Sequence, residues 1–314
     1  VMEYYIGKDY SLGGITLLCR FDGQRVTMAS QMSEADETVS SLYSVKSEQA
    51  TMLSFDTYNY LVHYFGQPQG SMSDDPNGTL GGDYEFIISS ASAERIELKG
   101  KKYGNRIVMK ALTEDQTWKQ YLTKIKKVED DAFFYEYDLL MDGLYTGQMI
   151  RSNYTFIVTY YDEIGKVHQK TVPFMFTADG LRFHEPVTID GQTMQNFVWK
   201  NELISFVCTD EGATGVKLAG VYTAGYQSYD YYPGTYQMDF YRLNDETGQL
   251  EVASQEVRLL KNEDRKSYWL KGLEYDILVM YDKPRGGLSV SPQLLEKVQG
   301  GYVYLAMWDV MNDY

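Results

Sequence analysis

The three histidines are the first residues to consider for chemistry, because imidazole titrates near neutral pH and ligates metals. His63 stands in the aromatic and apolar run YLVHYF, where a packed, hydrogen-bonded histidine is expected. His168 follows an Asp/Gly turn and is expected to be exposed, and His184 precedes Glu185 just past a predicted strand. Neither HExxH nor paired CxxC motifs occur, so the sequence gives little support to a zinc site and predicts no metal ligand. Convergence of the three histidines on a metal or haem is left open.

Motifs for nucleophilic catalysis and phosphate binding are absent from the sequence. It contains no GxSxG elbow, no Walker loop and no GxGxxG after a predicted strand. Cys19 and Cys208 lie in apolar strand patterns, where we expect two buried free thiols rather than a long-range disulfide. With 44 acidic residues in the chain, two carboxylates near one another would be no sign of a glycosidase. The sequence therefore predicts no catalytic residue and no cofactor.

A glycine-rich segment, SMSDDPNGTLGGDYEF, carries oxygen ligands of the kind that Ca²⁺ prefers: Asp74, Asp75, Asn77 and Asp83. Their spacing does not fit an EF-hand loop, which needs alternating ligands and a Glu at the twelfth position. Asp, Asn, Gly and Pro also favour turns for backbone reasons alone. We therefore interpret the segment as a solvated turn and leave calcium binding undecided.

Seven tyrosines occur between residues 222 and 241, in YTAGYQSYDYYPGTYQMDFY. From Tyr236 onward the residues alternate as in a strand, so Tyr236 is expected in the core or at its rim. The preceding tyrosines lie among Gly, Ser, Gln and Asp, a composition typical of loops that bind ligands, because rings give contact area and hydroxyls give hydrogen bonds. We predict that this loop binds a sugar or peptide through four residues: Tyr226, Tyr229, Tyr231 and Tyr232. The alternative is that the rings cover the end of a barrel.

The elements that must position these residues are mostly strands, because period-two alternation of apolar residues dominates the chain. The stretch GGITLLCRFDGQRVTMAS places Ile15, Leu17 and Cys19 on one face and turns at Asp22-Gly23, a strong hairpin signal. Similar runs separated by Asp/Gly turns continue to the end of the sequence. The chain is therefore predicted to be mainly β.

One amphipathic helix is predicted at about residues 113–128. Thr113 and Gln116 match a capping box, and Trp118, Leu122 and Ile125 recur at helical spacing. Short strands followed by one such helix predict a lipocalin-like up-and-down β-barrel that the helix closes.

Two domains fit the length of 314 residues. We predict a lipocalin-like domain at residues 1–130 and a second β-rich domain, a barrel or sandwich, at residues 131–314. A division of the second part near residues 209–215, in a polar segment, is left open.

Charge and hydropathy restrict the partners. The chain has 29 basic and 44 acidic residues, a formal net charge of −15, and a calculated pI of about 4.7. An acidic surface repels nucleic acids and anionic membranes. No apolar run reaches the roughly 18 residues that suggest a membrane span. The 29 tyrosines are typical of a β protein exposed to the outside of the cell.

Several stretches resemble one family of Bacteroides-type surface lipoproteins that is known only as a domain of unknown function. They are SFDTYNYLVHYF, GGDYEFIISSASAERIELKGKKYGNRI, TEDQTWKQYLTKI and VPFMFTADGLRFHEPVTIDGQTMQNFVW. The resemblance covers most of the first two hundred residues. It implies export, an outer-membrane lipid anchor on a Cys upstream of residue 1, and a place among nutrient-uptake proteins, on the cell surface or at the periplasmic face. It supplies no catalytic residue.

The sequence thus favours a non-catalytic cell-surface lipoprotein that binds a nutrient, such as a glycan or another small molecule, and works with outer-membrane uptake proteins. Two alternatives are kept. One is a carrier that holds an apolar molecule or haem inside the barrel, which predicts an interior cavity faced by His63 or a Met. The other is a hydrolase that uses paired carboxylates.

Overall fold

The computed structural model describes residues 1–47, 50–68, 78–112, 116–162, 164–244, 246–264 and 266–306. The chain forms two compact units, Val1–Val221 and Tyr222–Tyr314. In the described ranges, no helix combines the length and the apolar character that crossing a membrane requires.

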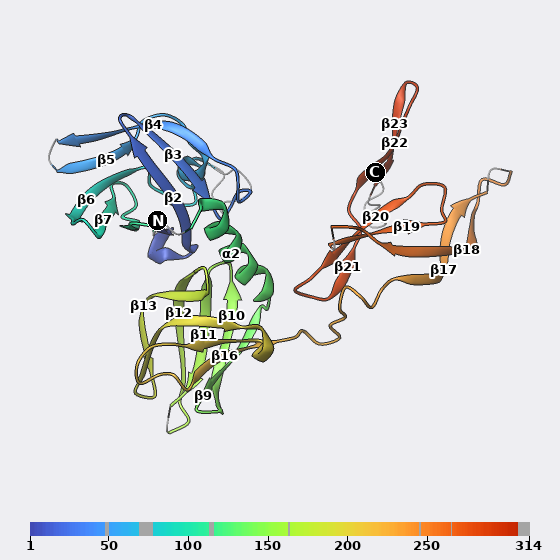
Figure 1. Cartoon of the computed structure of the whole chain (residues 1–314). Coiled ribbons are helices and arrows are strands. Elements are labelled where there is room, and N and C mark those ends of the chain that lie inside the picture. The colour runs from blue at the N-terminus through green and yellow to red at the C-terminus, as the bar shows by residue number, and fades with distance from the viewer. Residues whose placement is uncertain are drawn as a thin grey trace. The chain divides into compact units, whose positions relative to one another are not determined.

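The first unit begins with a closed up-and-down barrel of eight antiparallel strands, in which β1 pairs with both β2 and β8 (Figure 1). Alternation places Ile15 and Leu17 inside the barrel, as predicted, and Val26 and Met28 of β3, which pair with Phe21 and Cys19, belong to the same core. The strands are β1 (Met2–Ile6), β2 (Gly13–Asp22), β3 (Arg25–Ser30), β4 (Val39–Ser47), β5 (Thr51–Phe55), β6 (Glu85–Ala91), β7 (Arg95–Gly100) and β8 (Arg106–Lys110). Short helices are η1 (Lys8–Tyr10), α1 (Tyr60–His63) and η2 (Tyr64–Gly66).

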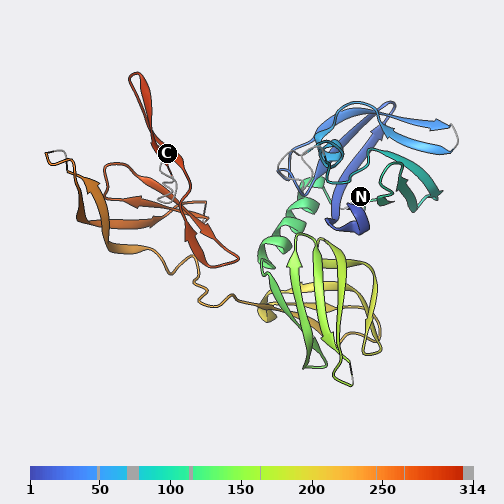
Figure 2. The same cartoon turned by 180° about the vertical axis from the view of Figure 1, so that it is seen from behind.

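A second closed up-and-down barrel follows in the same unit, and Figure 2 shows it from behind. In this barrel β9 pairs with β16. Its interior is filled largely by aromatic rings, among them Tyr137, Phe156 and Phe174. The strands are β9 (Glu136–Met141), β10 (Leu144–Ser152), β11 (Thr155–Tyr161), β12 (Val167–Phe176), β13 (Gly180–Ile189), β14 (Gln192–Lys200), β15 (Ser205–Cys208) and β16 (Val216–Val221), with η4 (Asn201–Leu203) between β14 and β15.

The helix α2 (Trp118–Asp131) connects the two barrels (Figure 1). It begins four residues later than the sequence pattern suggested. Thr117 and Gln120 form the capping box. The prediction was displaced by one turn because Thr113 and Gln116 have the same Thr-x-x-Gln spacing. Thr113 itself lies outside the described residues. The apolar stripe of α2 is buried, as its spacing predicted.

The two barrels are packed directly against each other, and β2 contacts β12. Gly13 makes this approach possible. Its φ of +71° lies in the left-handed region, and a β carbon there would be 2.1 Å from the carbonyl oxygen of Tyr154. The Tyr154 hydroxyl also donates a 2.8 Å hydrogen bond to Glu129 of α2. Helix and barrels therefore form one packed unit.

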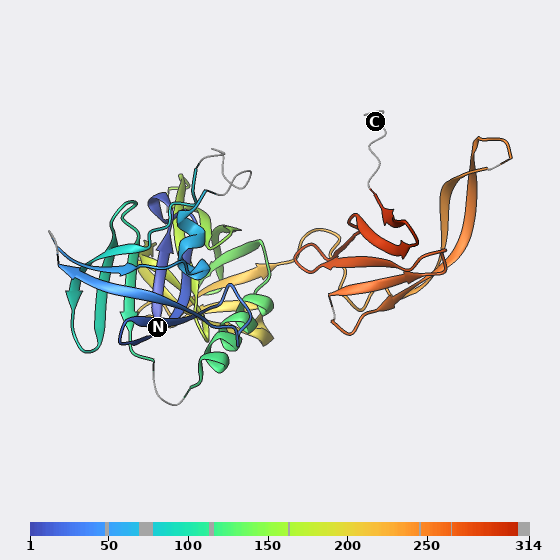
Figure 3. The ribbon, with the colours of Figure 1, turned by 90° about the horizontal axis from the view of Figure 1, so that it is seen from above.

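The second unit contains a five-stranded antiparallel sheet and a separate hairpin (Figure 3). Its core is small and rich in tyrosine, with Leu259, Tyr268 and Val279 at the centre. The strands are β17 (Gly234–Leu243), β18 (Leu250–Lys261), β19 (Ser267–Lys271), β20 (Ile277–Asp282), β21 (Gly287–Ser289), β22 (Gln293–Val298) and β23 (Gly301–Leu305).

The mainly β fold, the N-terminal up-and-down barrel with its following helix, and the second β-rich region are confirmed. The domain boundaries predicted at residue 130 and near residues 209–215 stay predictions.

Candidate ligand-binding site

The four tyrosines predicted to bind ligand have different environments within the second unit. Tyr229 and Tyr232 pack against its core, and Tyr229 stacks on Tyr268 with ring centroids 4.6 Å apart. The Tyr229 hydroxyl donates to the carbonyl of Ser267 at 2.8 Å, and that of Tyr232 to the carbonyl of Gly286 at 2.6 Å. Tyr226 is half-buried and accepts a 3.2 Å hydrogen bond from Tyr281.

Tyr231 is the most exposed of the four, with 62% of its surface accessible. Tyr236, expected in the core or at its rim, is 44% exposed, and its hydroxyl donates to the carbonyl of Tyr232. Ligand binding by the four predicted tyrosines stays a prediction, but two of them support the fold directly.

We expect Tyr229→Ala to destabilise the second unit by roughly 2 kcal/mol, because it removes a stacked ring and the hydrogen bonds of its hydroxyl. Tyr231→Ala should change the free energy of unfolding by no more than about 0.5 kcal/mol, as is usual for surface positions. Chemical denaturation of the full chain, followed by near-UV circular dichroism, measures both. Equal effects of the two substitutions would contradict this assignment of roles.

The histidines and cysteines lie in different parts of the structure and do not form one site. His63 bonds with the backbone of Asn59 and stacks on Tyr84 at 4.6 Å, and His168 contacts Asp162 at 2.8 Å. His184 lies between the barrels. Cys19 and Cys208 are free thiols. Across the described ranges, no three His, Cys, Asp or Glu side chains are grouped so as to hold a metal ion.

Asp83 organises a turn. It is buried, and its carboxylate accepts hydrogen bonds from the backbone amides of Lys102, Tyr103 and Asn105 and from the Asn105 side chain. The other members of the suggested calcium loop, Asp74, Asp75 and Asn77, lie outside the described residues.

Among the described residues, the interior of the first barrel holds a core of buried side chains. Met2, Met28 and Phe86 are all fully buried in one core cluster. His63, which the carrier hypothesis placed toward the interior, lies on α1 beside the exposed rings of Tyr58 and Tyr84.

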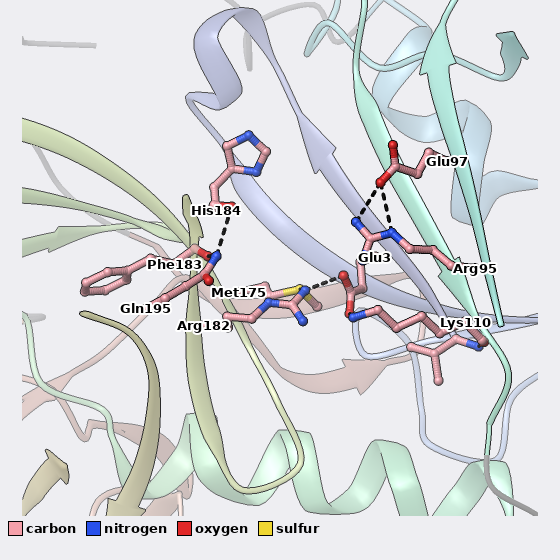
Figure 4. A network of polar contacts seen from close by, with 10 residues as sticks. Glu3, Arg95, Glu97, Lys110, Met175, Arg182, Phe183, His184 and Gln195 are labelled. Carbon is pink, nitrogen blue, oxygen red and sulfur yellow. Dashed lines mark hydrogen bonds and ion pairs between the residues drawn. The ribbon is translucent and has the colours of Figure 1, made fainter. Parts of the chain in front are cut away.

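A polar cavity of about 290 Å³ lies between the two barrels, at the lower end of the size range of small-molecule sites. Residues of both barrels line it, and Figure 4 shows several of them. The first barrel contributes Glu3, Tyr5, Arg95, Arg106, Val108 and Lys110, and the second contributes Arg182, His184, Gln195 and Asn196.

Strand alternation positions the side chains of β1 at this cavity. Met2, Tyr4 and Ile6 point into the barrel, so Glu3 and Tyr5 point outward toward the second barrel. All five residues of β1 are buried because both faces are covered. Arg106 pairs with Tyr5 across β8 and β1, which places the two side chains next to each other on the outer face.

On the second barrel, a bulge sets the position of His184. The register of β13 and β14 shifts between Arg182 and Val187, and bulges re-aim side chains in this way. The Gln195 amide nitrogen donates to the carbonyls of Phe183 and His184 across the bulge (Figure 4). The imidazole of His184 lies 4.3 Å from the Tyr5 ring and 4.2 Å from the Tyr10 ring, centroid to centroid.

Two polar atoms of the cavity, the Tyr5 hydroxyl and His184 Nδ1, are buried and make no hydrogen bond of good geometry among the described residues. The Arg182 guanidinium nevertheless lies close enough to the Tyr5 hydroxyl to act on its pKa, in the direction opposite to burial. Tyr5 is 3% exposed, and the His184 side chain is 6% exposed. Burial raises the pKa of Tyr5 to about 12. Burial, together with the positive charge of Arg106, lowers the pKa of His184 to about 4, so the imidazole is neutral at pH 7.

The cations of the cavity are unequally neutralised. Glu3 pairs with Arg182 of the other barrel and with Lys110 at 3.1 Å (Figure 4). Burial alone would raise the pKa of Glu3, but the hydrogen bonds and charges of Arg182 and Lys110 outweigh it, and the pKa is lowered. Arg95 pairs with Glu97 at 2.8 Å. For Arg106, no carboxylate of the described ranges lies within ion-pair distance.

The amide side chains from β14 present acceptors. The side-chain nitrogen of Asn196 donates a hydrogen bond to Asp210 at 2.7 Å, which identifies the second terminal atom of this amide as its oxygen. The same reasoning applies to Gln195, whose nitrogen donates to two backbone carbonyls. Each amide therefore has an oxygen that accepts no hydrogen bond from a described residue.

This arrangement suits binding better than acid–base chemistry. Glu3 is the one carboxylate among the lining residues, and its lowered pKa makes it a poor proton donor at neutral pH. A glycosidase needs two carboxylates at the bond to be broken. The cavity therefore gives the hydrolase alternative no support.

Sequence reasoning missed every residue of this cavity except His184, which it noted without assigning a role. One feature of the sequence could have indicated it. In MEYYI, alternation puts Tyr4 in the core, so Glu3 and Tyr5 lie on the outward face, where a large ring next to an acidic residue suggests that this face is covered. The contact between the barrels could not be read from that pattern.

Comparisons with known proteins give families without an assigned activity. A family described as a domain of unknown function (DUF4302) matches residues 1–201, and a second domain of unknown function, DUF4987, matches residues 209–314. No curated protein and no solved structure matches the chain.

Proposed function

We propose that this chain, which belongs to the DUF4302 family, is a non-catalytic binding module that captures a small polar ligand between its two barrels. One observation carries the proposal. Among the described residues, neither the Tyr5 hydroxyl nor His184 Nδ1 makes a hydrogen bond of good geometry, although both atoms are buried and both residues line the same cavity. Leaving such a group unsatisfied costs about 1–3 kcal/mol, so a bound ligand that satisfies both atoms would recover stability that the empty fold forgoes.

The sequence resemblance supports a setting for this module. In that setting the protein is exported and anchored to the outer membrane through a lipidated Cys upstream of residue 1. It faces the cell surface or the periplasm, and it passes a nutrient, such as a sugar released from a glycan, to outer-membrane uptake proteins.

Tyr5→Phe tests the proposal, because it separates binding from folding. Removing an oxygen that makes no hydrogen bond of good geometry among the described residues should change the melting temperature of the ligand-free protein little. The same change should reduce stabilisation by a ligand that uses this oxygen, since a ligand of the native state raises its stability. Thermal unfolding is measured with a library of neutral sugars, acidic sugars, sugar phosphates and amino acids, and each compound is then recovered and identified by mass spectrometry.

Tyr4→Phe is the matched control. Its hydroxyl donates to the carbonyl of Asp83 at 2.8 Å and accepts from the Asp83 amide at 2.6 Å, on the other face of the same strand. This control should lower stability without affecting the ligand-induced shift. The proposal fails if no compound gives a shift that depends on Tyr5, and a compound that is recovered chemically altered would indicate an enzyme instead.

A further inference from the structure

Resting on the proposed function, we infer that the ligand of the inter-barrel cavity is an acidic sugar: a hydroxylated body about the size of a monosaccharide, carrying one anionic group that binds Arg106. The anionic group is a carboxylate or a phosphate ester, which share this chemistry.

The charge of the lining residues indicates an anion. Four basic side chains face a single acidic one, Glu3, in a chain whose acidic residues outnumber its basic ones by 44 to 29. Glu97 neutralises Arg95, and Glu3 is shared between Lys110 and Arg182. Arg106 is left without a carboxylate from the described residues, and its planar guanidinium suits bidentate binding of a carboxylate or phosphate.

The same charges disfavour a metal cation. Four basic side chains line the cavity beside His184, so a further cation there would be repelled. Anions gain from this field, and they gain more in a site that is partly shielded from water.

The remaining polar atoms indicate hydroxyl groups on the ligand. The amide oxygens of Gln195 and Asn196 can only accept hydrogen bonds, and a carboxylate or a dianionic phosphate ester can only accept as well. An anionic group of this kind alone therefore cannot satisfy them. A ligand hydroxyl can donate to these oxygens, and it can also bond with the Tyr5 hydroxyl and His184 Nδ1, which are buried without a hydrogen bond of good geometry among the described residues.

The cavity volume limits the size of the ligand. At about 290 Å³ it lies at the lower end of the range for small-molecule sites, which fits one sugar unit rather than a long oligosaccharide. Val108 and Tyr5 add only a small apolar portion to the lining, because 4% and 3% of their surfaces are exposed.

Isothermal titration calorimetry of the full chain with matched pairs of ligands tests the inference. Glucose, galactose and mannose are each compared with their uronic acid and with their 6-phosphate, and acetate and dianionic methyl phosphate serve as anions without hydroxyl groups. We expect at least one acid to bind ten or more times tighter than its parent sugar and than the corresponding simple anion. The preference should fall with salt and disappear in Arg106→Met. Whether the uronic acids or the phosphates show it decides between the two anionic groups.

Each other result has a definite meaning. A parent sugar that binds as tightly as its acid, with a dependence on Tyr5, overturns the acidic character and leaves the proposed function standing. Acetate or methyl phosphate binding as tightly as the sugar acids overturns the requirement for hydroxyls. Binding of a different library compound in a Tyr5-dependent way, with none of the sugars bound, overturns the inference alone. Absence of any Tyr5-dependent ligand overturns the proposed function with it.

Discussion

Replacing Arg106 by methionine is expected to lower the affinity for the acidic sugar that binds best by about 30-fold or more, equivalent to 2 kcal/mol or more. The reason is that Arg106 is half-buried beside Tyr5 and has no carboxylate partner among the described residues, so its charge is available to the ligand. Methionine keeps much of the length of the side chain and removes the charge. Affinity for the neutral parent sugar should change much less, and titration calorimetry with both ligands measures the difference.

Lys99→Met is the matched control for Arg106→Met. Lys99 lies directly opposite Arg106 in the pairing of β7 with β8, but it is exposed and does not line the cavity. Both variants lower the net charge by one, so a general effect of charge on anion binding would appear in both. If Lys99→Met weakens binding as much as Arg106→Met does, long-range electrostatics explains the preference and the direct contact with Arg106 is wrong.

The barrels could be predicted from the sequence because their strands obey a local rule. Ile15 and Leu17 lie inside the first barrel because alternation and the turn after Asp22 fix both register and face. The start of α2 was placed one turn early because two Thr-x-x-Gln patterns stand four residues apart, and local sequence does not decide between them. The residue at which a helix begins depends on which of its possible first turns packs against the surrounding structure.

The cavity between the barrels could not be predicted, since it depends on contacts between distant segments. Glu3 and Arg182 are 179 residues apart, and nothing in either local pattern joins them. The loop tyrosines show the opposite difficulty. A tyrosine-rich composition occurs both in ligand-binding loops and in small cores that have few aliphatic residues. Tyr229 packs on Tyr268 in the core of the second unit, so core formation accounts for some of these tyrosines.

Glu3→Gln is expected to destabilise the first unit by roughly 2–3 kcal/mol, because it removes the one carboxylate that neutralises both Arg182 and Lys110. The Glu3 side chain is 10% exposed and that of Arg182 is 22% exposed, so solvent compensates little of the loss. For a unit of this size, the melting temperature should fall by about 5–10 °C. Glu97→Gln breaks the exposed pair with Arg95 and, as the control, should cost less than about 1 kcal/mol.

The effect of Glu3→Gln should depend on pH in a defined direction. The pKa of Glu3 is lowered in the folded state from its ordinary value of 4.5, so its stabilising contribution is fully present above pH 4.5. The contribution is lost as the pH falls through the folded-state pKa. The difference in stability between wild type and Glu3→Gln should therefore be constant from pH 7 to about pH 5 and shrink below pH 4.5. A difference that persists unchanged well below the folded-state pKa would show that packing, not charge, is responsible.

Glu3→Gln should also bind the acidic sugar more tightly than wild type, although it is less stable. Glu3 occupies the two cations, Arg182 and Lys110, that a ligand anion would otherwise meet, so removing its charge increases the positive potential of the cavity. A gain in affinity of a few-fold alongside a loss in stability would identify Glu3 as a residue that stabilises the empty cavity in competition with the ligand. Arg106→Met should weaken binding of the acidic sugar, whereas Glu3→Gln should strengthen it. These opposite changes in affinity would distinguish an anion-binding site from an ion pair that only holds the barrels together. If Glu3→Gln weakens the binding of the acid, the ligand contacts Glu3 through a shared proton or hydroxyl. In that case Arg182 and Lys110 do not become binding partners of the anion when the Glu3 charge is removed.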